Sequence, residues 1–284
     1  MTDQGRRWIQ ASRPPKAGGN SWDTAAARAI TRPYLDGRMA LVKRRAHLGL
    51  IDRWLPDLRT ATVLKTDLWE EGVAGDELLF TLAQRARSAY GIDISSNVLS
   101  SASRAAARAG VAPRLVQGDL RHLPFEDATI DAVVSTSTLD HLPDRDRLLA
   151  VREIHRVLRP NGALVLTCDN ADNVGDPLLR LAARLRLVPF PLERSLSLEE
   201  LRRLLHRAGF ESRGDAYLVH GPRVLTTLLV RGLALLPGSW GPSAIERMLG
   251  TFDRVGRRMP SRCGAFIAVR AVPRHTFGAG GRGC

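Results

Sequence analysis

Cysteine is scarce in this chain of 284 residues, and its spacing excludes two classes of small stabilised domain. Cys168, Cys263 and Cys284 lie far apart, and none has a second cysteine or a histidine beside it at ligand spacing. This pattern argues against a disulfide framework and against a zinc site. We expect no metal centre, and we expect the protein to work in a reducing compartment such as the cytoplasm.

Lysine and aromatic residues are also rare. Lys16, Lys43 and Lys65 are the only lysines, so arginine supplies the other 39 of the 42 basic residues, and the net charge is +13. Such a charge permits contact with anionic partners, but the arginines are scattered over every expected helix. Aromatic residues make up 5% of the chain. A nucleic-acid binder usually gathers basic and aromatic residues on one face, so nucleic acid is not the expected partner.

Long apolar runs are absent as well. Residues 1–21 are polar and rich in proline and glycine, without the apolar core of a signal peptide, so we expect a disordered arm there. The segment Val224–Leu236 is apolar but too short to span a bilayer. It would pack on the sheet, cap an apolar substrate pocket, or lie on a membrane surface through residues 224–240. Arg223 and Arg231 suit the membrane alternative. The oligomeric state stays open.

From about Ala61 the chain alternates short apolar runs with helical patterns, which predicts an α/β, doubly wound and mostly parallel sheet. Seven strands are expected, at 61–66, 89–94, 114–117, 130–135, 163–168, 212–219 and 264–272. Helices are expected at 22–54 with a break at Pro33, at 97–109, and at 144–158, where the turn 159–162 ends the helix. Ser197 and Glu200 form a capping box that opens a further helix, with Leu196 and Leu201 as its hydrophobic staple and Gly209 at its end.

These elements predict one main domain between two disordered ends. The expected parts are the arm 1–21, a doubly wound domain 22–273 and a tail 274–284. Within the domain we expect a helical lid at 22–58, a cofactor-binding core at 59–210, and C-terminal strands at 211–273 with a helical insert at 221–260.

Ligands in such sheets lie beyond the carboxyl ends of the strands, so polar residues there are the candidates for a site. Asp93 ends the second strand, where a carboxylate can accept both hydroxyls of a ribose. Asp119 follows the third strand and would accept a hydrogen bond from an adenine amino group, or it would simply form an Asx turn. Asp140 and His141 follow the fourth strand. His141 would take a proton from a substrate, or it would pack under the next helix.

Four segments, in this order and spacing, resemble the motifs of class I S-adenosylmethionine (SAM)-dependent methyltransferases of the methyltransferase-11 type. They read VLKTDLWEEGVAGDELL, AYGIDIS, LVQGDLRHLPFEDATIDAVVSTSTLDHLPD and REIHRVLRPNGALVLTCDN, and the likeness covers about 61–210. The resemblance implies a Rossmann-like fold and SAM as cofactor. It implies that Asp93 and Ile94 bind the ribose, that Asp119 and Leu120 bind the adenine, and that the segment from Ser135 lines the methionine side. Tyr34 faintly resembles a lid tyrosine.

The first of these motifs departs from the family pattern of an acidic residue followed by Gly-x-Gly-x-Gly. Lys65 replaces the acid, and the glycine positions carry Asp67, Trp69 and Glu71. Gly72 and Gly75 would then supply the tight turn later than usual. Lys65 and Asp67 would contact the cofactor, with the acids pairing with its ammonium or sulfonium group; alternatively, Lys65 and the acids form a solvated loop or a local ion pair. A third interpretation is that the site does not bind SAM.

The sequence as a whole therefore predicts a SAM-dependent methyltransferase that acts on an oxygen or nitrogen of a small or lipid-like molecule. Asp140 or His141 would be the catalytic base. The alternative is a protein of the same fold that transfers no methyl group, as a cofactor-free catalyst or a binding partner in a biosynthetic pathway. We expect it to be cytoplasmic, with peripheral membrane contact as a further interpretation.

Overall fold

The computed structural model describes residues 21–31, 37–75, 77–185, 194–220, 226, 229–230, 232–233, 240–256 and 258–274. Most of the expected N-terminal arm and C-terminal tail, Pro33, Tyr34 and most of the apolar segment 224–236 lie outside these residues. Among the residues described, no helix combines the length and the apolar character that a membrane span requires.

The fold is built on one seven-stranded sheet with the strand order β3-β2-β1-β4-β5-β7-β6. The strands are β1 Thr62–Thr66, β2 Ser88–Asp93, β3 Arg114–Gln117, β4 Ile130–Thr136, β5 Leu158–Asp169, β6 Phe210–His220 and β7 Gly264–Pro273. All neighbours among β1 to β5 pair in parallel, whereas β7 runs antiparallel to both β5 and β6. This sheet confirms the expected α/β, mostly parallel fold.

The described helices connect and cover these strands. They are α1 Ser21–Thr31, α2 Gly37–Trp54, α3 Leu78–Arg85, α4 Ser96–Arg108, α5 Asp144–Val157, α6 Asp176–Arg184, α7 Leu198–Arg207, α9 Trp240–Gly256 and α10 Pro260–Cys263. Two short turns of other helical type follow β1 and β4: the π-helical η2 Glu70–Ala74 and the 3-10 helix η3 Leu139–His141.

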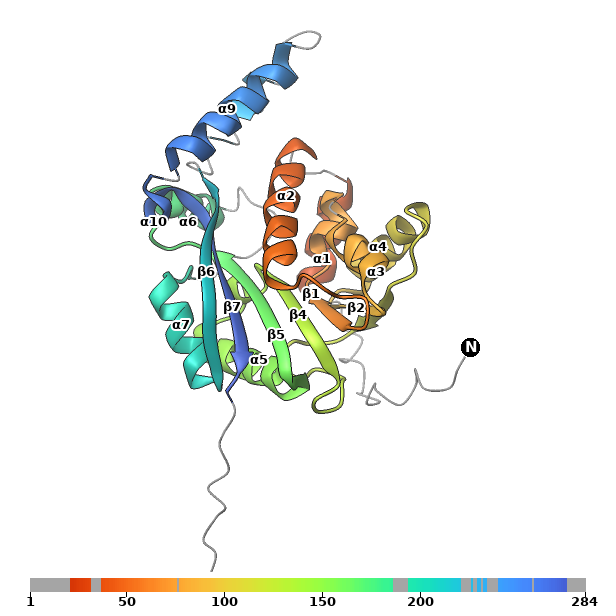
Figure 1. Cartoon of the computed structure of the whole chain (residues 1–284). Coiled ribbons are helices and arrows are strands. Elements are labelled where there is room, and N and C mark those ends of the chain that lie inside the picture. Colours follow the sequence, from red (N-terminus) through yellow and green to blue (C-terminus); the bar gives the residue numbers. More distant parts are fainter. Residues whose placement is uncertain are drawn as a thin grey trace, which may run out of the picture.

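Alternating side chains of the central strands place helices on both faces of the sheet (Figure 1). Leu64 and Val133 pack in one cluster with residues of α5 and α7. Their neighbours Val63 and Val134 pack in another cluster with residues of α2 and α3. A strand that is buried on both faces reads as a nearly continuous apolar run, which is why the central strands were easy to find in the sequence.

One expected boundary is wrong. The turn expected at 159–162 does not separate helix from strand, because α5 ends at Val157 and β5 begins at Leu158. Leu158 pairs with Ile130, and the register then shifts before Ala132 pairs with Ala163. The residues that favour a turn are thus accommodated as an irregularity inside an extended strand.

The capping box is confirmed at the start of α7. The Ser197 hydroxyl accepts a hydrogen bond from the Glu200 N–H at 3.2 Å, and the Glu200 carboxylate accepts one from the Ser197 N–H at 2.9 Å. Leu196 and Leu201, the expected staple, are both buried in the main core. Gly209 follows the helix with a φ of 98°, a conformation that favours glycine.

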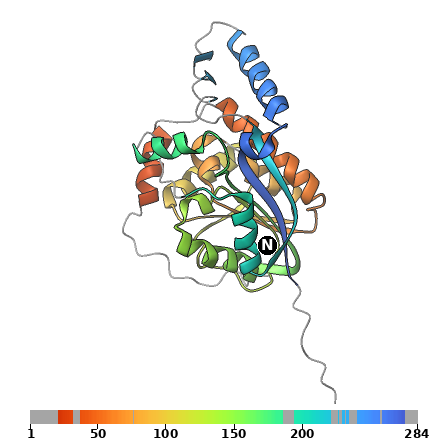
Figure 2. The same cartoon turned by 90° about the vertical axis from the view of Figure 1, so that its left-hand side faces the viewer.

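The C-terminal helices extend from the β6 and β7 side of the sheet. α9 projects beyond the edge at which β5 ends, and the view turned by 90° shows it standing apart from the sheet (Figures 1 and 2). His220, the last residue of β6, contacts Asp253 of α9 through Nδ1 at 2.9 Å. The described part of the expected insert is therefore helical and joined to the sheet at this edge.

Candidate functional site

The strand order places the candidate site where β1 and β4 lie side by side. The chain leaves β1 toward β2 and leaves β4 toward β5, on opposite sides, so this pair is the point at which the winding of the sheet reverses. Ligands of doubly wound folds bind beyond the carboxyl ends of the strands at that point. The segments that follow β1 and β4, η2 and η3, are therefore the two sides of the candidate site.

Lys65 and Glu71 form a buried ion pair inside the first motif. Lys65 Nζ lies 3.0 Å from Glu71 Oε2, and the two side chains are 1% and 0% exposed. The other Glu71 oxygen accepts the N–H of Leu79 in α3 at 2.9 Å, and Lys65 also donates to the carbonyl of Asp67. Burial alone would lower the pKa of Lys65, but the neighbouring carboxylates raise it, so the ammonium stays charged. The local ion pair, one of the interpretations open from the sequence, is present, and it is buried rather than solvated.

Asp67 reproduces the backbone conformation that a glycine usually supplies. Its φ is 65°, in the left-handed region, which aspartate tolerates better than most residues. Its carboxylate accepts the N–H of Trp69 at 2.9 Å and so stabilises the turn. Gly75, with a φ of 73°, ends η2 as expected, whereas Gly72 faces α4, where a Cβ would lie 2.8 Å from the Val98 carbonyl.

The third acidic residue of the motif, Glu70, pairs with Lys43 of α2. Burial would raise the pKa of Glu70, but Lys43 lowers it to about 2. His47, one turn further along α2, lies 3.4 Å from the Thr167 hydroxyl, and burial, followed by Lys43, lowers its pKa to about 3. A neutral imidazole and a paired carboxylate thus lie where α2 reaches the carboxyl edge of the sheet.

Asp93 ends β2 and faces the first motif. One carboxylate oxygen accepts the Leu68 N–H and the other accepts the Ser95 N–H, both at 2.8 Å. Burial, with the nearby charge of Asp67, raises the pKa of Asp93 to about 7. Ile94, the other residue expected at the ribose, follows directly, and its carbonyl accepts a hydrogen bond from the Gln117 amide at 3.2 Å.

Asp119 follows β3 and is held by an arginine that the sequence interpretation missed. Arg121 donates from Nε at 3.0 Å and from a terminal nitrogen at 2.6 Å to Asp119, and its other terminal nitrogen lies 2.7 Å from Asp146. Burial would raise the pKa of Asp119, but Arg121 lowers it. The Asx turn is present too, because the Arg121 N–H donates to Asp119 at 2.9 Å. The neighbouring Leu120 packs into the main core.

Hydroxyl groups gather where β1 and β4 end. The Thr66 hydroxyl lies 2.9 Å from both the Ser135 and the Thr138 hydroxyls, and the Ser135 hydroxyl donates to that of Thr138 at 3.2 Å. The expected cofactor residue Ser135 thus meets two partners that sequence reasoning missed. Ser137 adopts a φ of 56°, and its N–H donates to the Thr167 carbonyl at 2.9 Å. Its hydroxyl oxygen is buried and has no hydrogen-bond partner among the residues that the structure describes.

The two expected catalytic residues have different surroundings. Asp140 is 1% exposed, and its carboxylate accepts the N–H of Asp169, the last residue of β5, at 2.9 Å. The ring of His141 lies 4.9 Å from that of Trp22 in α1, at an interplanar angle of 69°. The geometry therefore gives Asp140 a role in fixing the ends of two strands and leaves His141 as the better candidate for a base.

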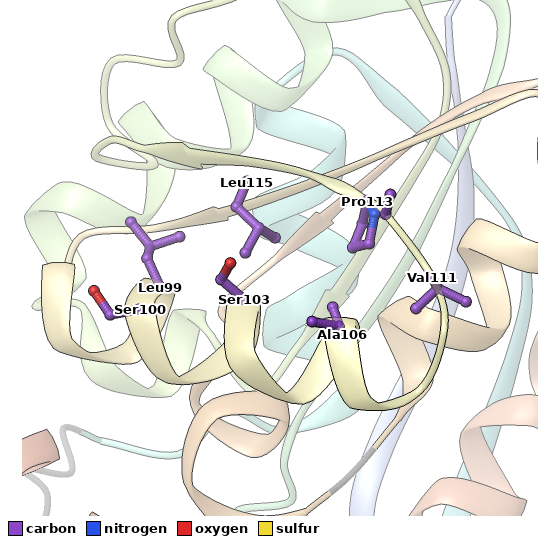
Figure 3. Close-up of a pocket in the computed structure, with 9 residues that line it drawn as sticks. Leu99, Ser100, Ser103, Ala106, Val111, Pro113 and Leu115 are labelled. Carbon is purple, nitrogen blue, oxygen red and sulfur yellow. The ribbon is translucent and has the colours of Figure 1, made fainter.

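A separate groove lies between α4 and the approach to β3, away from this edge (Figure 3). Small and apolar side chains line it, among them Leu99, Ser103, Ala106, Pro113 and Leu115. No residue expected at the cofactor or catalytic site and no charged residue belongs to its lining. The groove therefore offers no charged acid or base for methyl transfer.

The residues at the carboxyl edge fit SAM on two observations. The chemistry of Asp93 suits a ribose, because a carboxylate with one N–H per oxygen still has lone pairs for two hydroxyl groups. The buried Ser137 hydroxyl offers a polar group that the described protein leaves unused. The fold is that of class I methyltransferases, and this edge is where such a sheet would hold a ligand.

Comparison with known proteins agrees with this class. Residues 69–166 match the model of a methyltransferase domain family. A probable S-adenosylmethionine-dependent methyltransferase of Mycobacterium tuberculosis is 36% identical over 110 residues, which are 39% of this chain and 37% of that protein. The 27-O-demethylrifamycin SV methyltransferase of Amycolatopsis mediterranei is 35% identical over 131 residues, 43% of this chain and 44% of that protein. The matched segments span less than half the length of these relatives.

Solved structures share the fold over most of the chain. Magnesium protoporphyrin IX methyltransferase from Synechocystis PCC 6803, solved with bound SAH, has a TM-score of 0.57 at 16% identity, covering 89% of this chain and 96% of that one. The [4+2]-cyclase SpnF has a TM-score of 0.56 at 18% identity, covering 89% of this chain and 91% of that one. The solved structures therefore show the fold of class I methyltransferases, and residues 69–166 carry the match to the methyltransferase domain family.

Proposed function

We propose that the protein is a SAM-dependent methyltransferase that acts on an oxygen or nitrogen of a small or lipid-like molecule. The observation that carries the proposal is Asp93, a carboxylate at the end of β2 with both oxygens turned to the carboxyl edge by the N–H groups of Leu68 and Ser95. It lies inside the segment that matches the methyltransferase domain model.

In this proposal the nucleoside half of the cofactor contacts the ends of β2 and β3. Asp93 and Ile94 accept and cover the ribose, and Leu120 lies beside the adenine. Asp119 faces the adenine amino group, while Arg121 donates to both of its oxygens. Arg121 then holds the carboxylate in place through its fork of two hydrogen bonds.

The methionine half contacts the first motif and the loop after β4. Two of the three acids there oppose the cofactor carboxylate little, since Lys65 offsets Glu71 and Lys43 offsets Glu70. Ser135 and the unpartnered Ser137 hydroxyl supply polar groups on the other side. When bound, SAM supplies an electrophilic methyl group on a sulfonium sulfur.

His141 is the proposed base. A hydroxyl or amine becomes a better nucleophile as it loses its proton, and a histidine within hydrogen-bond reach can accept that proton near neutral pH. Holding the acceptor close to the donor would supply the rest of the catalysis. The named activities of two relatives, rifamycin O-methylation and ubiquinone and menaquinone C-methylation, support a small-molecule acceptor without identifying the attacked atom.

Calorimetry with purified protein tests the proposal directly. We expect SAM and its demethylated product SAH to bind, and Asp93→Ala to weaken both. Transfer of labelled methyl from SAM to a panel of phenols, quinols and amines then tests the base: His141→Gln should lower the rate, whereas His206→Gln, an exposed histidine of α7, should not. Absence of binding at millimolar SAM would refute the proposal.

The glycine-poor first motif favours a second candidate, a protein of this fold that transfers no methyl group. The likeness in fold to the [4+2]-cyclase SpnF agrees with such a protein. Mass spectrometry of ligands that co-purify with the protein separates the two. SAM or SAH supports the methyltransferase, and an unrelated small molecule supports the alternative. A cytoplasmic location and contact of residues 224–240 with a membrane surface stay predictions.

A further inference from the structure

Three aromatic rings meet at the carboxyl edge between the segments that follow β1 and β4. Trp69 precedes η2, His141 ends η3, and Trp22 of α1 contacts both. The ring centroids of Trp22 and Trp69 are 5.9 Å apart at an interplanar angle of 77°, and those of Trp22 and His141 are 4.9 Å apart at 69°. The three rings thus join both sides of the site at the reversal point of the sheet.

Their position is notable in a chain with so few aromatic residues. Aromatic residues make up 5% of the sequence, with five tryptophans in all. Trp69 stands where the family pattern has a glycine, and it is 8% exposed, so its indole takes up space that a glycine would leave open. Two nearly perpendicular rings also form a corner, and walls of this kind surround cationic groups in proteins.

Two of the three acids in the first motif are paired with lysines. Glu71 is paired with Lys65 and Glu70 with Lys43, whereas the Asp67 carboxylate accepts a neutral backbone N–H and keeps its charge. A positively charged ligand group at this edge would therefore meet one uncompensated acid of the motif, Asp67. The negative faces of the indole rings add to the attraction for a cation.

Hydrogen bonds connect these rings to the proposed ribose residue. Asp23, next to Trp22, accepts the Ser95 hydroxyl at 2.6 Å, and the Ser95 N–H donates to Asp93. Asp23 also accepts the Asn97 N–H at 3.3 Å, at the start of α4. The position of Trp22 is thus set by the same turn that holds Asp93.

We propose that Trp22 and Trp69 form an aromatic enclosure that binds the sulfonium group of the methyl donor, in place of the contacts of a glycine-rich loop. This inference rests on the proposed methyltransferase function. His141 packs on Trp22 and is thereby held beside the ring that contacts the cation. The enclosure recognises positive charge, so it distinguishes SAM from SAH, which has a neutral thioether in the same position.

Calorimetric affinities for SAM and SAH test the enclosure in the full-length protein. Wild type should bind SAM more tightly than SAH, and Trp69→Leu and Trp22→Leu should each weaken SAM by about threefold to thirtyfold while changing SAH by about twofold or less. Trp69→Phe should keep most of the preference. Trp240→Leu, at a tryptophan of α9 that is 77% exposed, is the matched control and should change neither affinity.

The outcomes separate the two proposals. If wild type binds neither ligand, the proposed function fails and the enclosure fails with it. A second outcome is that wild type binds both ligands while each tryptophan variant, shown by circular dichroism to be folded, loses affinity for SAM and SAH equally. In that case the rings contribute only to the shape of the site, and only the enclosure is refuted. A selective loss of SAM affinity supports it.

Discussion

Replacement of Lys65 by methionine tests whether the buried ion pair supports the first motif. Methionine keeps the length of the side chain and removes the charge, which leaves Glu71 buried at 0% exposure without its ammonium partner. Removing one partner of a buried pair costs about 3–5 kcal/mol. We expect about 3 kcal/mol, the lower end, because Glu71 keeps the Leu79 N–H at 2.9 Å and can take up a proton.

A loss of this size is easily measured. For a domain of this length 1 kcal/mol shifts the melting temperature by about 2–4 °C, so Lys65→Met should melt about 6–12 °C below wild type. Urea denaturation followed by circular dichroism gives the free energy of unfolding. The double variant Lys65→Met/Glu71→Gln should recover most of the loss, since removing both charges of a buried pair is often nearly neutral.

The exposed pair of Arg203 and Glu199 in α7 provides the control. Its side chains are 64% and 77% exposed at a separation of 2.9 Å, and exposed pairs of this spacing contribute about 0.3–0.5 kcal/mol. Arg203→Met should therefore change stability little. A Lys65→Met protein that unfolds within about 1 kcal/mol of Arg203→Met, or a double variant without recovery, would refute the role of the buried pair.

Three further substitutions test other parts of the fold. Ser197→Ala removes the capping box of α7 and should cost about 1 kcal/mol in thermal or urea unfolding. Asp140→Ala leaves the Asp169 N–H without its acceptor and should cost about 1–3 kcal/mol, a loss that an unchanged melting temperature would contradict. The pKa of Asp93 is about 7 in the folded protein, against an ordinary 3.8. Between these two pH values the folded state therefore binds a proton that the unfolded chain has released. The stability that this group contributes is lost as the pH rises through about 7. Urea unfolding at about pH 5 and about pH 8 should show a smaller difference in Asp93→Asn than in wild type.

The strands and the capping box could be predicted from the sequence because they depend on local pattern. β4 and β5 are apolar on both faces, and Ser197 and Glu200 satisfy each other across one helical turn. The start of β5 could not be predicted from the sequence, because Pro160, Asn161 and Gly162 favour a turn on their own. Pairing with β4 and the contact of Arg159 with Asp131 at 2.5 Å hold this stretch extended instead.

The candidate site could be predicted from the sequence in part. Asp93 and Asp119 stand at strand ends, where residue type and position single them out as candidates. Arg121 and the Thr66 and Thr138 hydroxyls were missed because nothing in a single sequence marks a side chain that turns back onto its own strand end. The asparagine, serine and threonine residues at such positions are equally common in ordinary turns.

The charges of the first motif acquire a different meaning once their partners are known. As a sequence, Lys65, Asp67, Glu70 and Glu71 suggest a loop too charged to accept a cofactor that itself carries a carboxylate. In the folded chain, Glu70 and Glu71 meet lysines and Asp67 accepts a backbone N–H, so one of the three negative charges is left without a paired lysine. The turn that glycines usually provide is kept by Asp67 at a φ of 65° and by Gly75 at 73°. What the loop gains at the carboxyl edge is Trp69, and this is why we assign aromatic rings a part in recognising the donor's positive charge.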